Sequence, residues 1–161
     1  MAIFRTSRGR SVRHCHVRPH PLNGCEARQL TAAERQHLRE QVAVLHPHVV
    51  QVRAPSRRYN CLGYAYARAH GWFEHVGMFI HDDFLEVPMA NPRRGDVLVY
   101  EDENQVIVHS GFVQKVIGSH IKKVRSKWGG AAVVIHDPLD VDPSYGAPVR
   151  LLRRRRRSHS S

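Results

Sequence analysis

Hydrophobic and polar positions follow a helical spacing in the first half of the chain and form short strand-like runs in the second half. The first clear helix is predicted over about residues 32–46, where apolar residues recur on one face until Pro47 ends the pattern. Thr31 and Glu34 have the spacing of a capping box, in which two side chains satisfy backbone N–H groups at a helix start. We therefore expect an N-capped helix in this region.

A second helix is predicted from Cys61 to about His70. Asn60 is a favourable N-cap, several alanines favour the helix, and Gly71 is a natural C-terminal stop. The acidic, proline-containing segment 81–95 predicts a loop with at most one short helical turn. This arrangement places a cysteine at the first turn of a helix.

The chain after residue 95 consists of apolar runs separated by polar or glycine-containing turns, which is typical of strands joined by tight connections. We predict strands at 97–100, 105–109, 111–117, 121–128 and 131–136. The second and third of these are also compatible with one long strand, and a shorter strand is predicted near residues 49–52. Helices first and a mostly antiparallel sheet afterwards predict an α+β domain.

Charge is distributed unevenly along the chain. There are 25 Lys plus Arg against 14 Asp plus Glu, which gives a formal net charge of +11. Basic residues gather in an arm over residues 1–29 and in a tail over 151–161 that contains the run Arg153–Arg157. We expect both ends to be irregular and the domain at 30–150 to be folded. The favoured interpretation of the tail is a solvated segment that keeps the protein soluble. The alternative is docking onto a polyanion, such as nucleic acid, anionic lipid or an acidic partner.

Cys61 and His109 are the candidate nucleophile and base. A thiol attacks as the thiolate, which a helix N-terminus and a nearby imidazolium both favour. His109 would supply the imidazole if its strand packs beside the helix, so that the two groups share an exposed cleft. The backbone N–H of Cys61 and the amide of Asn60 are candidates for holding an oxyanion. The alternative is that Cys61 is a small buried core residue.

Three motifs resemble the core of papain-like cysteine hydrolases of the NlpC and CHAP type: Tyr59–Ala65, Gly95–Tyr100 and His109–Val113. A bacterial branch of papain-like domains, some of which resemble toxin or effector modules, has similar residues to Ser126–Gly129, His136 and Tyr145–Gly146. The resemblance covers about residues 57–150. It implies a papain-like fold in which Cys61 is the nucleophile, His109 is the base and a third polar residue orients the imidazole.

The third role has two candidates. Ser126 is expected on the same face as His109, whereas His136 lies on the next predicted strand. His136 is slightly favoured, because a serine orients an imidazole weakly. Asp96 belongs to the motif at a strand start, and it is expected to cap a turn.

We therefore expect a cysteine-dependent hydrolase of amide or peptide bonds, as a protease, an amidase or a deamidase. Acyl transfer is a related outcome, because an amine can also resolve the acyl-enzyme. The expected partners are a peptide or protein substrate and, for a toxin, a cognate inhibitor; no cofactor is expected. The alternative function is a non-enzymatic, basic nucleic-acid-binding protein, which the net charge favours. A third alternative is a papain-like scaffold without activity.

No apolar run reaches the length of a transmembrane helix, and the first residues lack the apolar core of a signal peptide. We therefore expect a cytoplasmic protein, or one exported without a classical signal peptide. Histidine and cysteine donors gather near the N-terminus without the spacing of known zinc sites, so no metal site is predicted. These donors are His14, Cys15, His16, His20 and Cys25.

Overall fold

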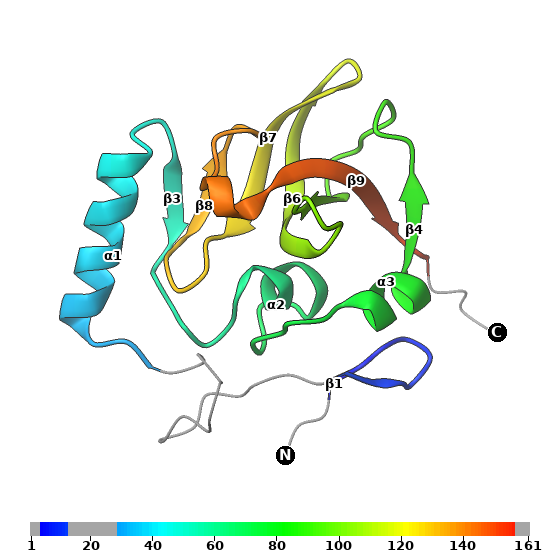
Figure 1. The fold of residues 1–161 in the computed structure, drawn as a ribbon, viewed down its shortest axis with the longest axis horizontal. Helices are drawn as coiled ribbons and strands as arrows, with labels where there is room; N and C mark the ends of the chain where they lie inside the picture. Colours follow the sequence, from blue (N-terminus) through cyan, green and yellow to red (C-terminus); the bar gives the residue numbers. More distant parts are fainter. Residues whose placement is uncertain (1–3, 13–28, 157–161) are drawn as a thin grey trace.

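The computed structural model describes residues 4–12 and 29–156 (Figure 1). A seven-stranded antiparallel sheet has the strand order β3-β8-β7-β6-β5-β9-β4, and a separate hairpin pairs β1 with β2. The hairpin strands are β1 (Phe4–Arg5) and β2 (Ser11–Val12). The sheet strands are β3 (Val50–Arg53), β4 (Phe84–Val87), β5 (Val97–Glu101), β6 (Ile107–Ile117), β7 (His120–Lys127), β8 (Val133–His136) and β9 (Ala147–Arg154).

The helices are α1 (Ala32–Leu45), α2 (Cys61–Tyr66) and α3 (Gly77–Asp83), with the short 3-10 helix η1 (Pro143–Tyr145). The prediction of an α+β fold is confirmed. In the described ranges, no helix combines the length and the apolar character needed to cross a bilayer.

The predicted N-terminus of α1 is confirmed in detail. The hydroxyl of Thr31 accepts a hydrogen bond from the backbone N–H of Glu34 at 3.2 Å. In return, the backbone N–H of Thr31 donates to the carboxylate of Glu34 at 2.8 Å. The capping box therefore satisfies two of the N–H groups that a helix start leaves without intrahelical partners.

The second helix is shorter than predicted, because α2 ends at Tyr66. Arg68 and Ala69 adopt positive φ angles of 54° and 63°, which end the right-handed helix. The chain then folds back over Gly63, where an added Cβ would collide with the carbonyl oxygen of Gly71. The return of the chain thus requires a glycine inside α2 as well as a turn after it.

For residues 105–117 the structure confirms the alternative of one long strand, whereas the loop predicted over 81–95 is wrong in part. The segments predicted at 105–109 and 111–117 form the single strand β6, which pairs with both β5 and β7. The segment 81–95, predicted as a loop, contains the end of α3 and all of β4. β4 lies at the edge of the sheet and pairs only with β9, so half of its residues face solvent and it lacks a strong apolar run.

The basic tail predicted to begin at residue 151 also needs correction, because β9 continues to Arg154. Leu151 and Leu152 are completely buried, one on each face of the sheet. Arg153 donates through Nε and Nη2 to the carboxylate of Asp96, at 2.8 Å in both cases. Asp96 also accepts from the backbone N–H of Arg93 at 2.8 Å, as expected of a residue that caps a turn.

Part of the predicted irregular arm is folded as well. The β1–β2 hairpin is held to α3 by Asp82, whose carboxylate accepts from Nε of Arg10 at 2.8 Å and from the hydroxyl of Thr6. The Arg10 guanidinium and the Thr6 hydroxyl hold the pKa of Asp82 far below its usual range, despite the opposing effect of desolvation. No local sequence pattern indicates this ion pair, because Arg10 and Asp82 are 72 positions apart.

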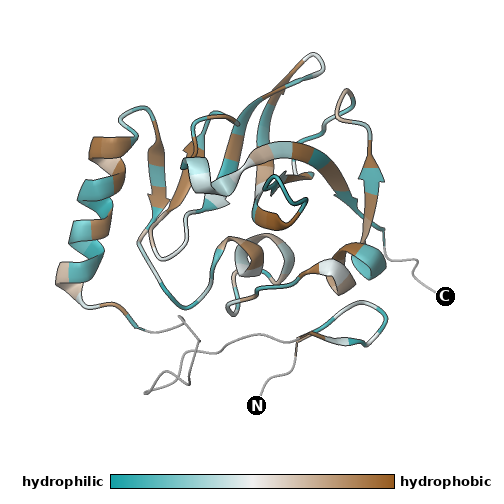
Figure 2. Cartoon of the chain, in the orientation of Figure 1, coloured by the Kyte–Doolittle hydropathy of each residue, from teal (hydrophilic) through white to brown (hydrophobic). Residues whose placement is uncertain are grey.

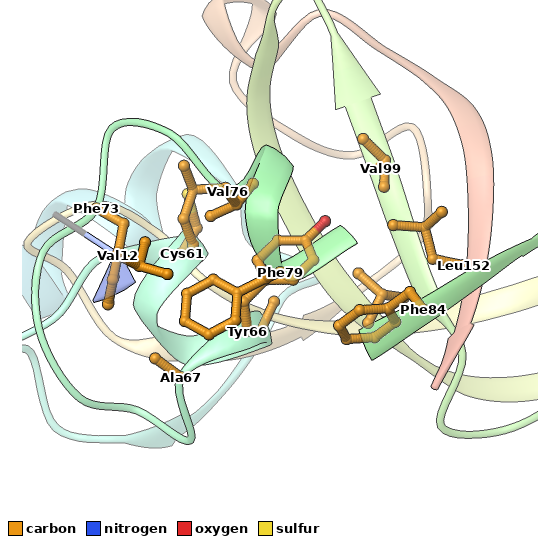
Figure 3. Close-up of a cluster of buried hydrophobic side chains, with 13 residues drawn as sticks. Val12, Cys61, Tyr66, Ala67, Phe73, Val76, Phe79, Phe84, Val99 and Leu152 are labelled. Atoms are coloured by element: carbon orange, nitrogen blue, oxygen red, sulfur yellow. The ribbon is translucent and has the colours of Figure 1, made fainter. Parts of the chain in front are cut away.

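The sheet carries a different apolar cluster on each face. Brown and teal segments alternate along its strands in Figure 2, as expected when successive side chains point to opposite faces. On one face, Val99 and Leu152 pack with α2 and α3 (Figure 3). On the other face, Leu98, Tyr100 and Leu151 form a second cluster. Only side chains on the first of these faces lie next to α2.

Candidate active site

Cys61 is the first residue of α2, and Asn60 is its N-cap, as predicted. The side-chain oxygen of Asn60 accepts from the backbone N–H groups of Gly63 at 2.9 Å and Phe73 at 3.2 Å. Its amide nitrogen donates to the carbonyl oxygen of Phe73 at 2.6 Å. Three hydrogen bonds of one buried amide therefore fix the position of the helix start.

The sulfur of Cys61 lies against β6. The thiol donates to the carbonyl oxygen of Val108 at 3.9 Å, and the residue is only 6% exposed within an apolar cluster (Figure 3). Burial raises the pKa of the thiol to about 11, although the backbone N–H groups of Ser110 and Leu62 favour the thiolate. The thiol is therefore protonated at neutral pH in this arrangement.

His109 is completely buried on β6. Its ring stacks on the ring of Tyr145, with 4.1 Å between the centroids and 2° between the planes, and contacts Tyr100 edge to face at 5.1 Å. Neither ring nitrogen has a hydrogen-bond partner among the described residues. Burial, assisted by the nearby His136, lowers the pKa of His109 well below its usual value, so the ring is neutral.

The Cys61 sulfur contacts the segment of β6 that carries His109, but no hydrogen bond joins the two side chains. The sulfur contacts the backbone on both sides of His109, at Val108 and Ser110. The Ser110 hydroxyl lies 3.1 Å from the hydroxyl of Tyr66 on α2, so by strand alternation the His109 ring points to the opposite face. The expectation of a shared exposed cleft is wrong, because both groups are buried.

Tyr145 lies near both groups. Its ring covers His109, and the Cys61 sulfur is one cause, after burial, of the raised pKa of its hydroxyl. Tyr145 belongs to η1, whose Pro143 and Ser144 are exposed. Tyr145 therefore places a surface segment of the chain directly over the His109 ring.

The two candidates for the third role, Ser126 and His136, bond to each other. The Ser126 hydroxyl lies 2.8 Å from Nε2 of His136 and accepts from Nε1 of Trp128 at 3.1 Å. Nδ1 of His136 lies 2.6 Å from the carbonyl oxygen of Asp137, so it carries the proton and Nε2 accepts from the serine. Neither side chain hydrogen-bonds to His109, although strand register places all three on one face.

Lys127 is a charged residue near Cys61 for which the sequence analysis proposed no role. It is fully buried, and its Nζ donates to the carbonyl oxygens of Ser56 at 2.6 Å, Gly129 at 2.5 Å and Ala131 at 2.6 Å. Burial lowers its pKa to about 7, while the sulfur of Cys61 acts in the opposite direction. These three bonds use all three N–H groups of an ammonium, and the positive charge favours a thiolate at Cys61.

The described residues contain no group of three or more histidine, cysteine or carboxylate side chains placed to hold a metal ion. The N-terminal donors His14, Cys15, His16, His20 and Cys25 lie outside the described residues.

Comparison with known proteins identifies no relative. No protein-family model matches the chain, no curated protein matches it, and no solved structure matches its fold. The papain-like resemblance therefore rests on the short motifs around Cys61, Asp96 and His109 and stays a prediction.

Proposed function

We propose that the protein is a cysteine-dependent hydrolase of amide or peptide bonds, with Cys61 as the nucleophile and His109 as the base. The observation that carries the proposal is His109 itself: a wholly buried imidazole with both nitrogens lacking a partner among the described residues, on the strand segment that Cys61 contacts. A buried polar group without a partner costs about 1–3 kcal/mol. Such groups are rare, and a catalytic role is one reason for a fold to keep one.

The neutral form of His109 fits the first step of this chemistry, whereas the pKa of the buried thiol, about 11, must fall before the proton can move. A general base must begin neutral, and burial keeps the His109 imidazole in that form. In the closed arrangement the His109 ring points away from Cys61, so opening of the site must also bring the ring to the sulfur. Cys61 would then lose its proton to His109, and the thiolate would attack the substrate carbonyl carbon. Backbone N–H groups at the start of α2 would hold the oxyanion. The amine would leave with the proton from His109, and water would then hydrolyse the thioester to release the acid and restore the thiol.

The proposal requires that the site opens before it reacts. With Tyr145 in place, the His109 ring is covered and the Cys61 thiol is protonated. Movement of η1 would uncover the His109 ring, and the opening must also let water reach the Cys61 sulfur, which would lower the pKa of the thiol because burial is the main cause that raises it. Lys127 would then stabilise the thiolate by its positive charge. His136 and Ser126 would support the face on which His109 lies.

A peptide or a protein side chain is the proposed substrate class. Attack on a glutamine side chain would give deamidation, and capture of the acyl-enzyme by an amine would give transfer. A toxin or effector role, with a cognate inhibitor and with action in the cytoplasm of a producing or target cell, is part of the proposal that follows from the motif resemblance alone.

The test is digestion of a mixed peptide library in water enriched in oxygen-18, read by mass spectrometry. We expect new labelled carboxyl termini, or labelled side-chain carboxylates if the enzyme is a deamidase. Cys61→Ala should abolish the products, and His109→Gln should slow them by about 10²- to 10⁴-fold. The matched control is His120→Gln, which changes an exposed histidine of β7 and should leave the rate unchanged.

Two results would overturn the proposal. The first is product formation that survives Cys61→Ala, since the thiol would then have no part in it. The second is the absence of labelled products from both the wild type and Tyr145→Ala, because removing the covering ring should expose His109 to the substrate.

A further inference from the structure

A groove lined by arginines lies away from Cys61, between the N-terminal hairpin and the end of β9. It has a volume of about 1100 Å³. Figure 1 shows the hairpin and the end of β9 next to α3, which contributes to the floor. The six arginines that line it are Arg5, Arg8, Arg68, Arg154, Arg155 and Arg156. They come from the hairpin, the turn after α2 and the C-terminal strand, so positive charge surrounds the groove on several sides.

The acidic residues of the groove are already engaged by the hairpin. Asp82 accepts from Arg10, which is not among the lining residues, and lies 3.9 Å from Nε of Arg8. Asp83 accepts from the backbone N–H of Ser7 at 2.9 Å. These contacts turn the two carboxylates toward the hairpin, and six guanidinium groups share the groove with them.

Two of the lining arginines donate to backbone carbonyl oxygens, which are neutral, so these bonds do not cancel their positive charge. Arg5 donates to the carbonyl oxygen of Gly9 at 3.2 Å, and Arg155 donates to that of Phe84 at 3.0 Å. A carbonyl satisfies a donor but does not neutralise a cation. Arginine presents several donors in a planar fork that matches phosphate oxygens, so these groups are suited to binding phosphate.

We propose that this groove binds single-stranded nucleic acid. Aromatic rings lie among the arginines, since Phe4 and His70 both line the groove with their rings 5.9 Å apart. Arginines for the backbone and aromatic rings for the bases are the two components of grooves that bind single strands without sequence preference. A flat bilayer would reach only the rim of a groove, and an acidic peptide would make no use of the rings.

The proposed site differs from the polyanion contact considered for the tail alone. Arg154 to Arg156 line the groove together with arginines of the hairpin and of the turn after α2. It is separate from the proposed hydrolase site: none of the residues Cys61, His109 and Tyr145 lines it. Binding of nucleic acid and hydrolysis can therefore fail independently in experiments.

The test is fluorescence anisotropy with a labelled, mixed-sequence RNA of about 12 nucleotides, within the site sizes known for single-strand binding grooves. The groove variant carries Arg8→Gln, Arg68→Gln and Arg156→Gln, which remove three charges from exposed side chains. The control variant removes three exposed arginines that do not line the groove, by Arg39→Gln, Arg58→Gln and Arg94→Gln. Both variants have the same net charge.

We expect the groove variant to bind about 10- to 100-fold more weakly than the wild type at moderate salt, and the slope of log K against log salt to fall by about 2. The control should lose less than about threefold in affinity. Cys61→Ser should bind like the wild type. If the groove triple is poorly folded by circular dichroism, the single change Arg156→Glu at an exposed position is used in its place and should weaken binding in the same direction.

Equal losses in the two triple variants would overturn the proposal, because the charge would then act diffusely over the whole surface. Unchanged binding by the groove variant would overturn it as well. Binding to phosphatidylserine vesicles without binding to RNA would assign the arginines to a membrane surface, and binding only to an acidic peptide would assign them to a protein partner; either result contradicts the proposal.

Discussion

His109 should make the protein less stable below neutral pH. An unfolded histidine takes up a proton with a pKa near 6.5, whereas burial holds the pKa of His109 in the folded protein well below that value. The folded state therefore binds fewer protons at this site than the unfolded state does. Stability is at its full value above pH 6.5 and is lost as the pH falls.

While the His109 ring stays neutral in the folded protein, the loss of stability depends only on how much this histidine is protonated in the unfolded chain. Lowering the pH from 7 to 5 should reduce the free energy of unfolding by about 2 kcal/mol through His109. Burial also lowers the pKa of His136, which adds a contribution of the same sign. Asp82 does not contribute in this range, because its pKa lies far below it.

The assay is urea unfolding followed by tryptophan fluorescence at pH 7, 6 and 5, with wild type and His109→Phe. Phenylalanine keeps a flat ring that can stack on Tyr145 but cannot take up a proton. The wild type should lose about 2 kcal/mol more than the variant between pH 7 and 5. Equal losses in the two proteins would show that the imidazole of His109 can take up a proton inside the fold, contrary to the prediction.

Three further predictions concern the helix start and the sheet beside it. Asn60→Ala should lower the free energy of unfolding by about 2–3 kcal/mol, because it removes the N-cap of α2 and the bonds to Phe73; urea titration showing no change would contradict this. Gly111→Ala should lower it by about 1–3 kcal/mol, because the new Cβ would lie 2.7 Å from Cβ of Ser126; a melting temperature equal to that of the wild type would argue against this packing. In a variant whose other two cysteines are serines, iodoacetamide should alkylate Cys61 faster with rising pH up to about 11 in the folded protein and level off near pH 8.5 in urea; the same profile in both states would mean that the sulfur is not buried.

The sequence predicted correctly those helices and strands that depend on residues close together in the chain. The Thr31–Glu34 capping box and the Asn60 N-cap act over three residues, so the starts of α1 and α2 were predictable. β5 and β8 were predictable for a similar reason, since each is a largely apolar run bounded by turns. β4 and β9 were missed because they carry exposed or charged residues whose strand conformation depends on pairing with distant partners.

The candidate site divides in the same way. The sequence alone identified Cys61 and His109 and placed the cysteine at a helix start, because a capping residue and a strand-like run are visible locally. Long-range packing buries both groups, places the Cys61 sulfur and the His109 ring on different faces of the sheet, and sets Tyr145 over the imidazole. These features depend on strand register and on contacts between residues far apart in the chain. Since burial is what raises the pKa of the thiol and lowers that of the imidazole, the chemistry of the site follows from packing that local sequence patterns do not encode.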